Sequence, residues 1–362
     1  MHHDSSCHHS HVAPSRRGVL AGASACIGGL ALGCGLERAL AQGARPDGIV
    51  DVHHHVSPPQ FITALSKYKL GERPMFNWTP GRSIEDMDRA GVALSITSIT
   101  TPGVWFGDNR EARDLARACN EYAAGLAQQY PGRFGTFASL PLPDVDGCLN
   151  EIEYAFDVLH VDGVGLMTSF GDKWLGDSSF APVMAELNRR KAVIYTHPTA
   201  ANCCRNLLPD VHYSVIELAS DTTRAIANLI FTGTTAQYPE IKFIFSHAGG
   251  TVPFIYQRLT RYPGLDRALG LGKNIEARVP GGVLPALRAL YYDTAQAAFP
   301  MAMEPLAKLV SSSQILFGTD FPFRTSADHV KGLTECGFTA AELAAIHRRN
   351  ALSLMPQLAG KH

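Results

Sequence analysis

The sequence has almost no excess of charge of either sign. Lysine and arginine together number 32, and aspartate and glutamate 33, among 362 residues, which leaves a formal net charge of −1. Proteins that bind nucleic acids normally carry a clustered excess of basic residues, so we expect no nucleic-acid partner. Apolar residues make up 46% of the chain and charged residues 18%, a balance that excludes both a disordered chain and a coiled coil.

Cysteine is scarce and follows no metal-binding pattern. Of the eight cysteines, three lie within residues 1–41, and the odd number that remains, at irregular spacing, predicts ordinary thiols rather than a disulfide framework or a zinc ribbon. The adjacent pair Cys203 and Cys204 leaves a redox role open. The residues after position 41 are numerous enough to bury a core without cross-links. The five cysteines beyond that position are Cys119, Cys148, Cys203, Cys204 and Cys336.

Long apolar runs are lacking except near the N-terminus. Arg16-Arg17 precedes a Gly- and Ala-rich apolar run that ends near Leu36, and Ala39-Leu40-Ala41 follows as a small-x-small cleavage site. The paired arginines resemble a twin-arginine export signal, and the run is hardly long enough to span a bilayer. We therefore predict a signal peptide over residues 1–41. Its removal would leave residues 42–362 in the periplasm without stable membrane insertion; an uncleaved anchor is the alternative.

Beyond residue 48, short β-rich runs alternate with amphipathic helical patterns. Such alternation is typical of parallel βαβ units, and eight units predict a closed (β/α)₈ TIM barrel over residues 42–362. An open doubly wound sheet would need a glycine-rich phosphate turn after its first strand, and the sequence has none there. Residues 264–282 are predicted as a long loop. The predicted strands are Ile49–Val56, Ala93–Thr100, Phe134–Leu140, Val161–Met167, Ala192–His197, Lys242–His247, Leu290–Thr294 and Ile315–Asp320.

Histidine and aspartate residues are concentrated where four of these strands end. Side chains alternate along a strand, so the two outer histidines of Asp51-Val52-His53-His54-His55 share one face, with Asp51 one layer deeper. Active sites of TIM barrels lie at the C-terminal ends of the strands, where these side chains would converge. Imidazole and carboxylate are ligands of divalent first-row metals, zinc above all. The strand-end residues are His53, His55, His197, His247 and Asp320.

These motifs carry a family resemblance. The Asp-x-His-x-His motif, with Thr196-His197-Pro198, Ser246-His247-Ala248-Gly249-Gly250 and residues 318–323, resembles the amidohydrolase superfamily over residues 49–323. Within it, the chain looks like the aminocarboxymuconate-semialdehyde decarboxylase branch, and in finer detail like 6-methylsalicylate decarboxylase-type members. Resorcylate-type decarboxylases carry a glutamate where this chain has Gly250.

The resemblance implies a set of roles for the strand-end residues. It implies one divalent ion, zinc or alternatively manganese, and no position for a carboxylated lysine that would hold a second. His247 would act as an acid and base without ligating the ion, and Asp320 would act both as a ligand and in catalysis. Arg258 matches a family arginine that reaches the substrate carboxylate of a neighbouring subunit, which implies a homodimer; a surface charge is the alternative. The implied ligands are His53, His55, His197 and Asp320.

Two reactions could use these parts. The family branch favours a metal-dependent, non-oxidative decarboxylase (carboxy-lyase) of a small aromatic or unsaturated carboxylic acid. The same site could hydrolyse an amide or a lactone, and a non-enzymatic metal-binding role is a third reading. Asp51 or Asp293 could orient the ligating histidines. Aromatic side chains near the strand-to-helix loops could contact a flat substrate, with Trp105 and Phe323 as the chosen candidates. The full set is Trp78, Trp105, Phe106, Trp174 and Phe323.

Overall fold

The computed structural model describes residues 47–361 of the chain. The predicted signal peptide, residues 1–41, lies outside this part. None of the helices in the described part is long and apolar enough to cross a membrane.

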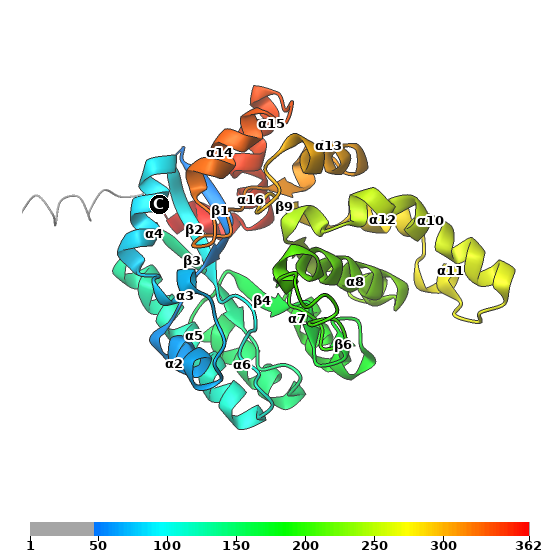
Figure 1. Ribbon diagram of the computed structural model, residues 1–362, viewed down its shortest axis with the longest axis horizontal. Coiled ribbons are helices and arrows are strands. Elements are labelled where there is room, and N and C mark those ends of the chain that lie inside the picture. The colour runs from blue at the N-terminus through cyan, green and yellow to red at the C-terminus, as the bar shows by residue number, and fades with distance from the viewer. Residues whose placement is uncertain (1–46, 362) are drawn as a thin grey trace, which may run out of the picture. The chain divides into compact units, whose positions relative to one another are not determined.

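Eight parallel strands surround the core of the described part (Figure 1). Successive strands pair in the order β1-β2-β3-β4-β7-β8-β9-β10, and main-chain hydrogen bonds connect the last strand's segment back to the first. Val52 N donates to Phe317 O at 2.9 Å and His55 N donates to Phe321 O at 2.7 Å. The predicted (β/α)₈ barrel is therefore confirmed. Its strands are β1 (Ile49–His55), β2 (Val92–Ser98), β3 (Phe134–Ser139), β4 (Gly163–Met167), β7 (Val193–His197), β8 (Lys242–Phe245), β9 (Tyr291–Asp293) and β10 (Ile315–Leu316).

Helices follow the strands and cover the outside of the barrel (Figure 1). The longest, α5, begins at a cap in which Asp108 Oδ1 accepts from Glu111 N at 2.7 Å, and it buries its apolar face on the strands. The helices are α2 (Pro59–Lys67), α3 (Arg73–Phe76), α4 (Pro80–Ala90), α5 (Asn109–Gln129), α6 (Val145–Asp157), α7 (Ala181–Arg189), α8 (Glu217–Phe231), α9 (Thr234–Gln237), α10 (Val252–Leu269), α11 (Ile275–Arg278), α12 (Val283–Arg288), α13 (Pro300–Leu309), α14 (Ser326–Thr334), α15 (Ala340–Ala344) and α16 (Asn350–Leu354).

The long loop predicted for residues 264–282 is wrong. Helix α10 continues through Pro263 and Gly264 to Leu269, and the short helix α11 follows. Only Val252 and Asp266 are buried among the residues of α10, so the helix has a weak apolar stripe. Because the pattern that reveals a helix comes from burial of one face, a mostly exposed helix with an internal proline shows little of it. The hairpin of β5 (Ser169–Phe170) and β6 (Lys173–Trp174) was also not predicted.

Large aromatic side chains fill the barrel beneath the strand ends. Tyr195 on β7 is fully buried, and its ring stacks on Phe137 of β3 with centroids 5.5 Å apart. The same ring meets the edge of His53 at 5.0 Å. The interior is therefore a packed layer that supports the histidines from below, and the site lies at the C-terminal ends of the strands.

Candidate metal centre

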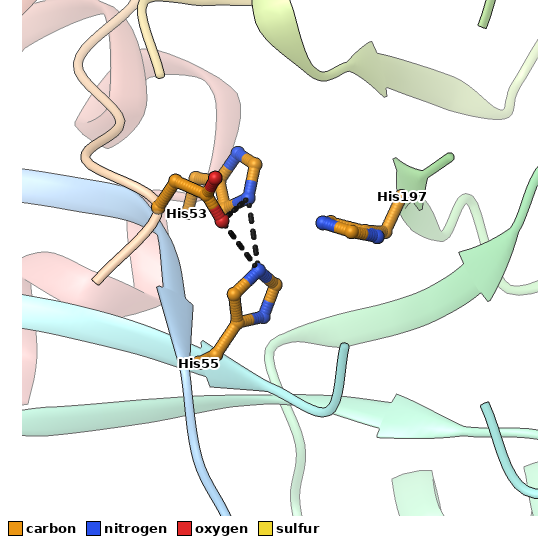
Figure 2. Close-up of side chains that lie close together, drawn as sticks. His53, His55 and His197 are labelled. Carbon is orange, nitrogen blue, oxygen red and sulfur yellow. Dashed lines mark hydrogen bonds and ion pairs between the residues drawn. The ribbon is translucent and has the colours of Figure 1, made fainter. Parts of the chain in front are cut away.

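Four side chains from three parts of the barrel rim converge on one point. His53 and His55 alternate along β1, His197 ends β7, and Asp320 follows β10. Each offers one ligand atom, these atoms all lie within 4.8 Å of one another, and all four residues are buried. Figure 2 shows the ring of His197 pointing toward those of His53 and His55. The side chains expected to meet at the rim do so.

Hydrogen bonds on the far side of each ring determine which nitrogen faces the centre. His53 Nδ1 lies 2.7 Å from Asp293 Oδ2, His55 Nδ1 lies 3.3 Å from Ser98 O, and His197 Nδ1 lies 2.9 Å from Pro198 O. These partners only accept, so in the neutral form that binds a metal each Nδ1 carries the proton and each Nε2 presents a lone pair. His53 Nε2 and His55 Nε2 lie 3.1 Å apart. Two lone pairs at that distance repel each other unless a cation lies between them.

The carboxylate of Asp320 completes this donor set. Its Oδ1 lies 3.2 Å from His53 Nε2 and 2.9 Å from His55 Nε2, and it is buried without a hydrogen-bond partner. Buried carboxylate oxygens normally have a partner, so this atom lacks one that a metal ion would supply. Asp320 adopts a left-handed backbone conformation (φ 64°), held by its N–H, which donates to His53 O at 2.9 Å. The residues present therefore fit a divalent metal ion.

The electrostatics of the cluster favour positive charge at its centre. Burial alone would lower the pKa of His53, but the carboxylates of Asp293 and Asp320 raise it to about 10. Burial lowers the pKa of His55 and, with the neighbouring histidines, lowers the pKa of His197 well below its usual value. Metal ligation requires neutral rings and releases protons, so the field that stabilises a proton on His53 would stabilise a divalent cation in its place.

His247 lies beside the cluster but outside the donor set. Its ring stacks on that of His53, with centroids 5.2 Å apart and planes at 28°. His247 Nε2 is 3.6 Å from Asp320 Oδ2, too long for a hydrogen bond, and it is buried without a hydrogen-bond partner. The structure thus places next to the candidate ligands an imidazole nitrogen that makes no hydrogen bond and lies within ion-pair distance of Asp320.

Asp293 and Asp51 support the cluster in different ways. Asp293 is fully buried at the end of β9, where Oδ2 binds the ring of His53 and Oδ1 accepts from His247 N at 2.9 Å. One carboxylate therefore orients the ring of a candidate ligand and holds the main chain of His247. Asp51 does not bind a candidate ligand's ring: its oxygens accept from the main-chain N–H of His53 at 2.9 Å and from the hydroxyl Thr319 Oγ1 at 2.7 Å. It joins β1 to the segment that carries Asp320.

Gly250, in the turn after β8, is required by the backbone. Its φ of 65° is a conformation that L side chains rarely adopt, and a Cβ atom there would lie 2.2 Å from Ala219 O on α8. No side chain fits at this position without moving α8. A glutamate at this position is therefore excluded by how α8 packs on the turn after β8.

The predicted substrate-binding residues lie in three different places. Phe323 is close to the cluster, with its ring centroid 6.0 Å from that of His55. Trp105 is half-buried in the loop after β2, where its indole donates to Asn109 Oδ1 at 3.2 Å. Arg258 is exposed on α10. Trp78 is buried in the hydrophobic core, and its indole donates to Ser83 Oγ at 2.9 Å.

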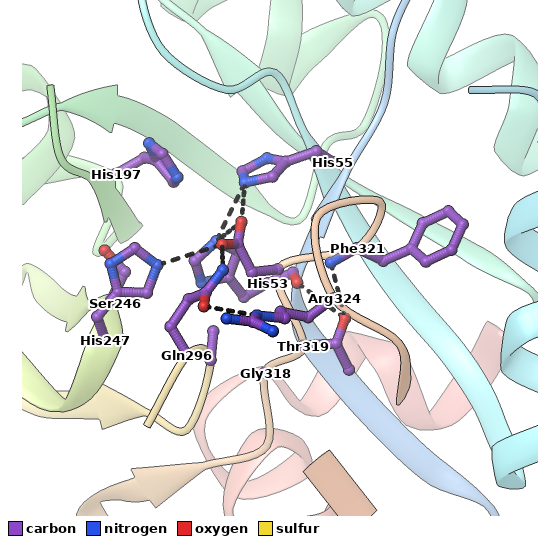
Figure 3. A network of polar contacts seen from close by, with 12 residues as sticks. His53, His55, His197, Ser246, His247, Gln296, Gly318, Thr319, Phe321 and Arg324 are labelled. Carbon is purple, nitrogen blue, oxygen red and sulfur yellow. Dashed lines mark hydrogen bonds and ion pairs between the residues drawn. The ribbon is translucent and has the colours of Figure 1, made fainter. Parts of the chain in front are cut away.

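Sequence reasoning missed two polar residues of the network at the rim (Figure 3). Gln296 Nε2 donates to Asp320 Oδ2 at 2.6 Å, and Arg324 Nε donates to Gln296 Oε1 at 3.0 Å. Gln296 is the third residue after the C-terminal residue of β9, and Arg324 is the fourth after Asp320. Both therefore follow strand ends at the same rim as the predicted ligands. This position, a few residues after a predicted strand, is the feature of the sequence that could have identified them.

Comparisons with known proteins agree with this geometry. The model of the amidohydrolase family, Amidohydro_2, matches residues 50–356. A 6-methylsalicylic acid decarboxylase from Penicillium expansum is 36% identical over 326 residues, covering 86% of this chain and 97% of the relative. A 2-amino-3-carboxymuconate-6-semialdehyde decarboxylase from Dictyostelium discoideum is 24% identical and covers 76% of this chain and 81% of its own.

A solved structure shows the same fold. The 5-carboxyvanillate decarboxylase from Novosphingobium aromaticivorans, complexed with manganese and 4-hydroxy-3-methoxy-5-nitrobenzoic acid, superposes with a TM-score of 0.75 at 19% identity. The match covers 85% of this chain and 96% of that one. The resemblance predicted from the strand-end motifs, including the finer match to 6-methylsalicylate decarboxylases, is confirmed, and the chain belongs to the amidohydrolase family.

Proposed function

We propose that the protein is a metal-dependent, non-oxidative decarboxylase of a small aromatic carboxylic acid, with hydroxylated benzoates as the substrate class. One observation carries this proposal. Four side chains converge with one metal-ligand atom each, and beside them lies an imidazole nitrogen, His247 Nε2, that makes no hydrogen bond. The decarboxylase relatives, which cover most of the chain, support the same reading.

The residues at the site have separate roles in the proposed reaction. A divalent ion held by the three histidines and Asp320 would supply positive charge that anchors the substrate carboxylate and a neighbouring phenolic oxygen. His247 adds a proton to the ring carbon that bears the carboxylate. The bond from that carbon to the carboxylate then breaks, its electron pair restores the aromatic ring, and CO₂ leaves. Phe323 offers an aromatic face beside His55 against which a flat ring can pack.

We propose zinc as the ion, because three imidazoles and one carboxylate match its preferred ligands. Manganese is the alternative, and the manganese in the 5-carboxyvanillate decarboxylase structure supports keeping it in the test. Elemental analysis of protein purified without added metal would identify the ion. We expect about one per chain.

Release of CO₂ from hydroxybenzoates tests the proposed function. Incubation of metal-loaded protein with 6-methylsalicylate or 2,6-dihydroxybenzoate should yield CO₂ and the ring without its carboxyl group in equal amounts. Protein stripped with a chelator should release none, and metal addition should restore the reaction. Hydrolysis of lactones or amides without any CO₂ would replace the proposal with the hydrolase reading.

We propose that the active protein is a homodimer in which Arg258 binds the substrate carboxylate held by the partner subunit. Arg258 is exposed on α10, and Phe254, one helical turn earlier, has 90% of its surface exposed. Leu265 and Leu269 on the same helix are also exposed, and such a row of apolar side chains suits a protein–protein interface. Analytical ultracentrifugation should give twice the mass of one chain, and Phe254→Asp should shift it to monomer. A wild-type monomer with full activity would contradict the dimer.

We also propose that residues 1–41 direct export by the twin-arginine route. The paired arginines and the small-x-small site support this proposal. N-terminal sequencing of protein from the periplasmic fraction should begin after Ala41.

A further inference from the structure

Gln296 connects the candidate metal ligand Asp320 to an exposed arginine. It lies just after β9, and its carboxamide is held between two charged groups: Nε2 donates to Asp320 Oδ2 at 2.6 Å, and Oε1 accepts from Arg324 Nε at 3.0 Å (Figure 3). A guanidinium group only donates and a carboxylate only accepts. The amide therefore has one orientation that satisfies both neighbours, with its nitrogen toward Asp320.

The main chain of Gln296 is held as firmly as its side chain. Its φ is 56°, a left-handed conformation that is uncommon for residues other than glycine. The N–H of Gln296 donates to His329 Nε2 at 3.0 Å, and His329 Nδ1 lies 2.9 Å from Thr325 O, so the ring of His329 is held by both nitrogens. Uncommon backbone conformations that persist because several contacts determine them are concentrated at functional sites.

The two oxygens of Asp320 are thereby given different environments. Oδ2 accepts the short hydrogen bond from Gln296, whereas Oδ1 faces the Nε2 atoms of His53 and His55 and has no hydrogen-bond donor. Without the amide, the carboxylate could rotate so that Oδ2 also turned toward the ion or approached His247, whose Nε2 is now 3.6 Å away. Either change would alter the donor set or engage the free imidazole.

We propose that Gln296 and Arg324 are positioning residues that hold Asp320 as a single-oxygen metal ligand and keep His247 free for proton transfer. This inference rests on the proposed function for its second half, while its first half concerns metal binding alone. The guanidinium polarises the amide and so strengthens the N–H that Asp320 accepts. Hydrogen-bond partners of metal ligands typically change metal affinity or activity by 10-fold to 100-fold.

The matched variants are Gln296→Leu, which keeps the size of the side chain but removes the donor, and Arg324→Met, which removes only the outer partner. Arg324 is exposed and lines a cavity of about 260 Å³ with Gln296, so its replacement leaves no buried charge behind. Arg324→Lys keeps the charge and should restore part of the effect. Gln128→Leu, on the exposed face of α5, is the control for the same chemical change elsewhere.

Binding of Mn²⁺ to metal-stripped protein tests whether Gln296 and Arg324 hold Asp320 as a metal ligand. Titration calorimetry gives the Kd, and the electron paramagnetic resonance spectrum reports the environment of the bound ion. Gln296→Leu should raise the Kd about 10-fold or more and change the spectrum, Arg324→Met should raise it less, and Gln128→Leu should match wild type. A wild-type Kd and spectrum in Gln296→Leu would overturn the inference, whether or not the protein releases CO₂. If Gln296→Leu does not fold, the comparison of Arg324→Met with Arg324→Lys decides by the same criteria.

Turnover at saturating metal tests whether Gln296 and Arg324 keep His247 free for proton transfer. Gln296→Leu should lower kcat by about 10-fold to 100-fold with little change in KM, because the substrate is still bound while the acid is misplaced. An unchanged kcat, or a loss confined to KM, would show that Gln296 does not act through His247. Absence of CO₂ release from the wild-type protein would reject the proposed function and leave the metal-binding result standing.

Discussion

Replacing His247 with asparagine should lower the rate of decarboxylation by a factor of about 10² to 10⁴ and leave metal binding intact. His247 Nε2 is buried and free of hydrogen bonds at the edge of the donor set, and no other imidazole there has a nitrogen to spare, because each ligand histidine also binds an acceptor through Nδ1. Asparagine is close in size to histidine and keeps the backbone N–H that donates to Asp293. It cannot deliver a proton at neutral pH.

The measurement for His247→Asn is kcat together with the metal content of the same preparation. His160→Asn is a suitable control, because His160 is exposed and has a φ of 53°, a conformation that asparagine also accepts. It should show wild-type turnover and metal content. If His247→Asn loses the ion as completely as a ligand variant does, His247 is a further ligand and the assignment of the acid is wrong.

Replacing His53 with alanine should abolish stoichiometric metal binding and, with it, activity. The substitution removes one of four donors and leaves Asp293, which is fully buried, without the ring that it binds at 2.7 Å. Breaking a buried ion pair from one side costs about 3–5 kcal/mol of stability because it leaves an uncompensated charge. The variant should therefore bind metal more than 100-fold more weakly, beyond the usual effect of altering a ligand's hydrogen-bond partner, and should melt at a lower temperature.

His54→Ala is the matched control, because it removes a histidine from the same strand but from its other face. His54 is buried, with Nδ1 3.1 Å from Asp51 Oδ2 and Nε2 2.9 Å from Ser83 Oγ. Its ring stacks on that of Phe321, with centroids 4.8 Å apart. Its loss should lower the melting temperature and leave about one ion per chain by elemental analysis. A His53→Ala protein that keeps its ion, or a His54→Ala protein that loses it, would refute the assignment of ligands from strand alternation.

Local patterns in the sequence were sufficient to predict that the strand-end histidines and Asp320 meet at one rim, and the family resemblance then implied which of them are ligands. Alternation along β1 puts His53 and His55 on one face in any strand of that sequence, because the side-chain period of a strand is two. The eight apolar runs show burial on both sides, and parallel strands in a closed barrel bring their C-terminal ends to one rim. The three further strand-end residues, His197, His247 and Asp320, then had to lie near one another.

Contacts between distant segments could not be predicted in this way. Asp293 was one of two candidates for orienting the ligands, and only the register of β9 against β8 and β10 brings it to both His53 and His247. Helix α10 was missed because most of it is exposed and so carries little of the periodicity that burial imposes.

The amino-acid sequence by itself determined the barrel and the meeting of the strand-end histidines and Asp320 at one rim, because both depend on strand period and strand direction, which are local properties of the chain. The division of these residues into four ligands and one free imidazole was implied by the family resemblance. Tertiary structure alone decided how Asp320 is oriented. That depends on Gln296 and Arg324, residues from two different loops whose side chains meet only when β9 and β10 lie side by side in the closed barrel.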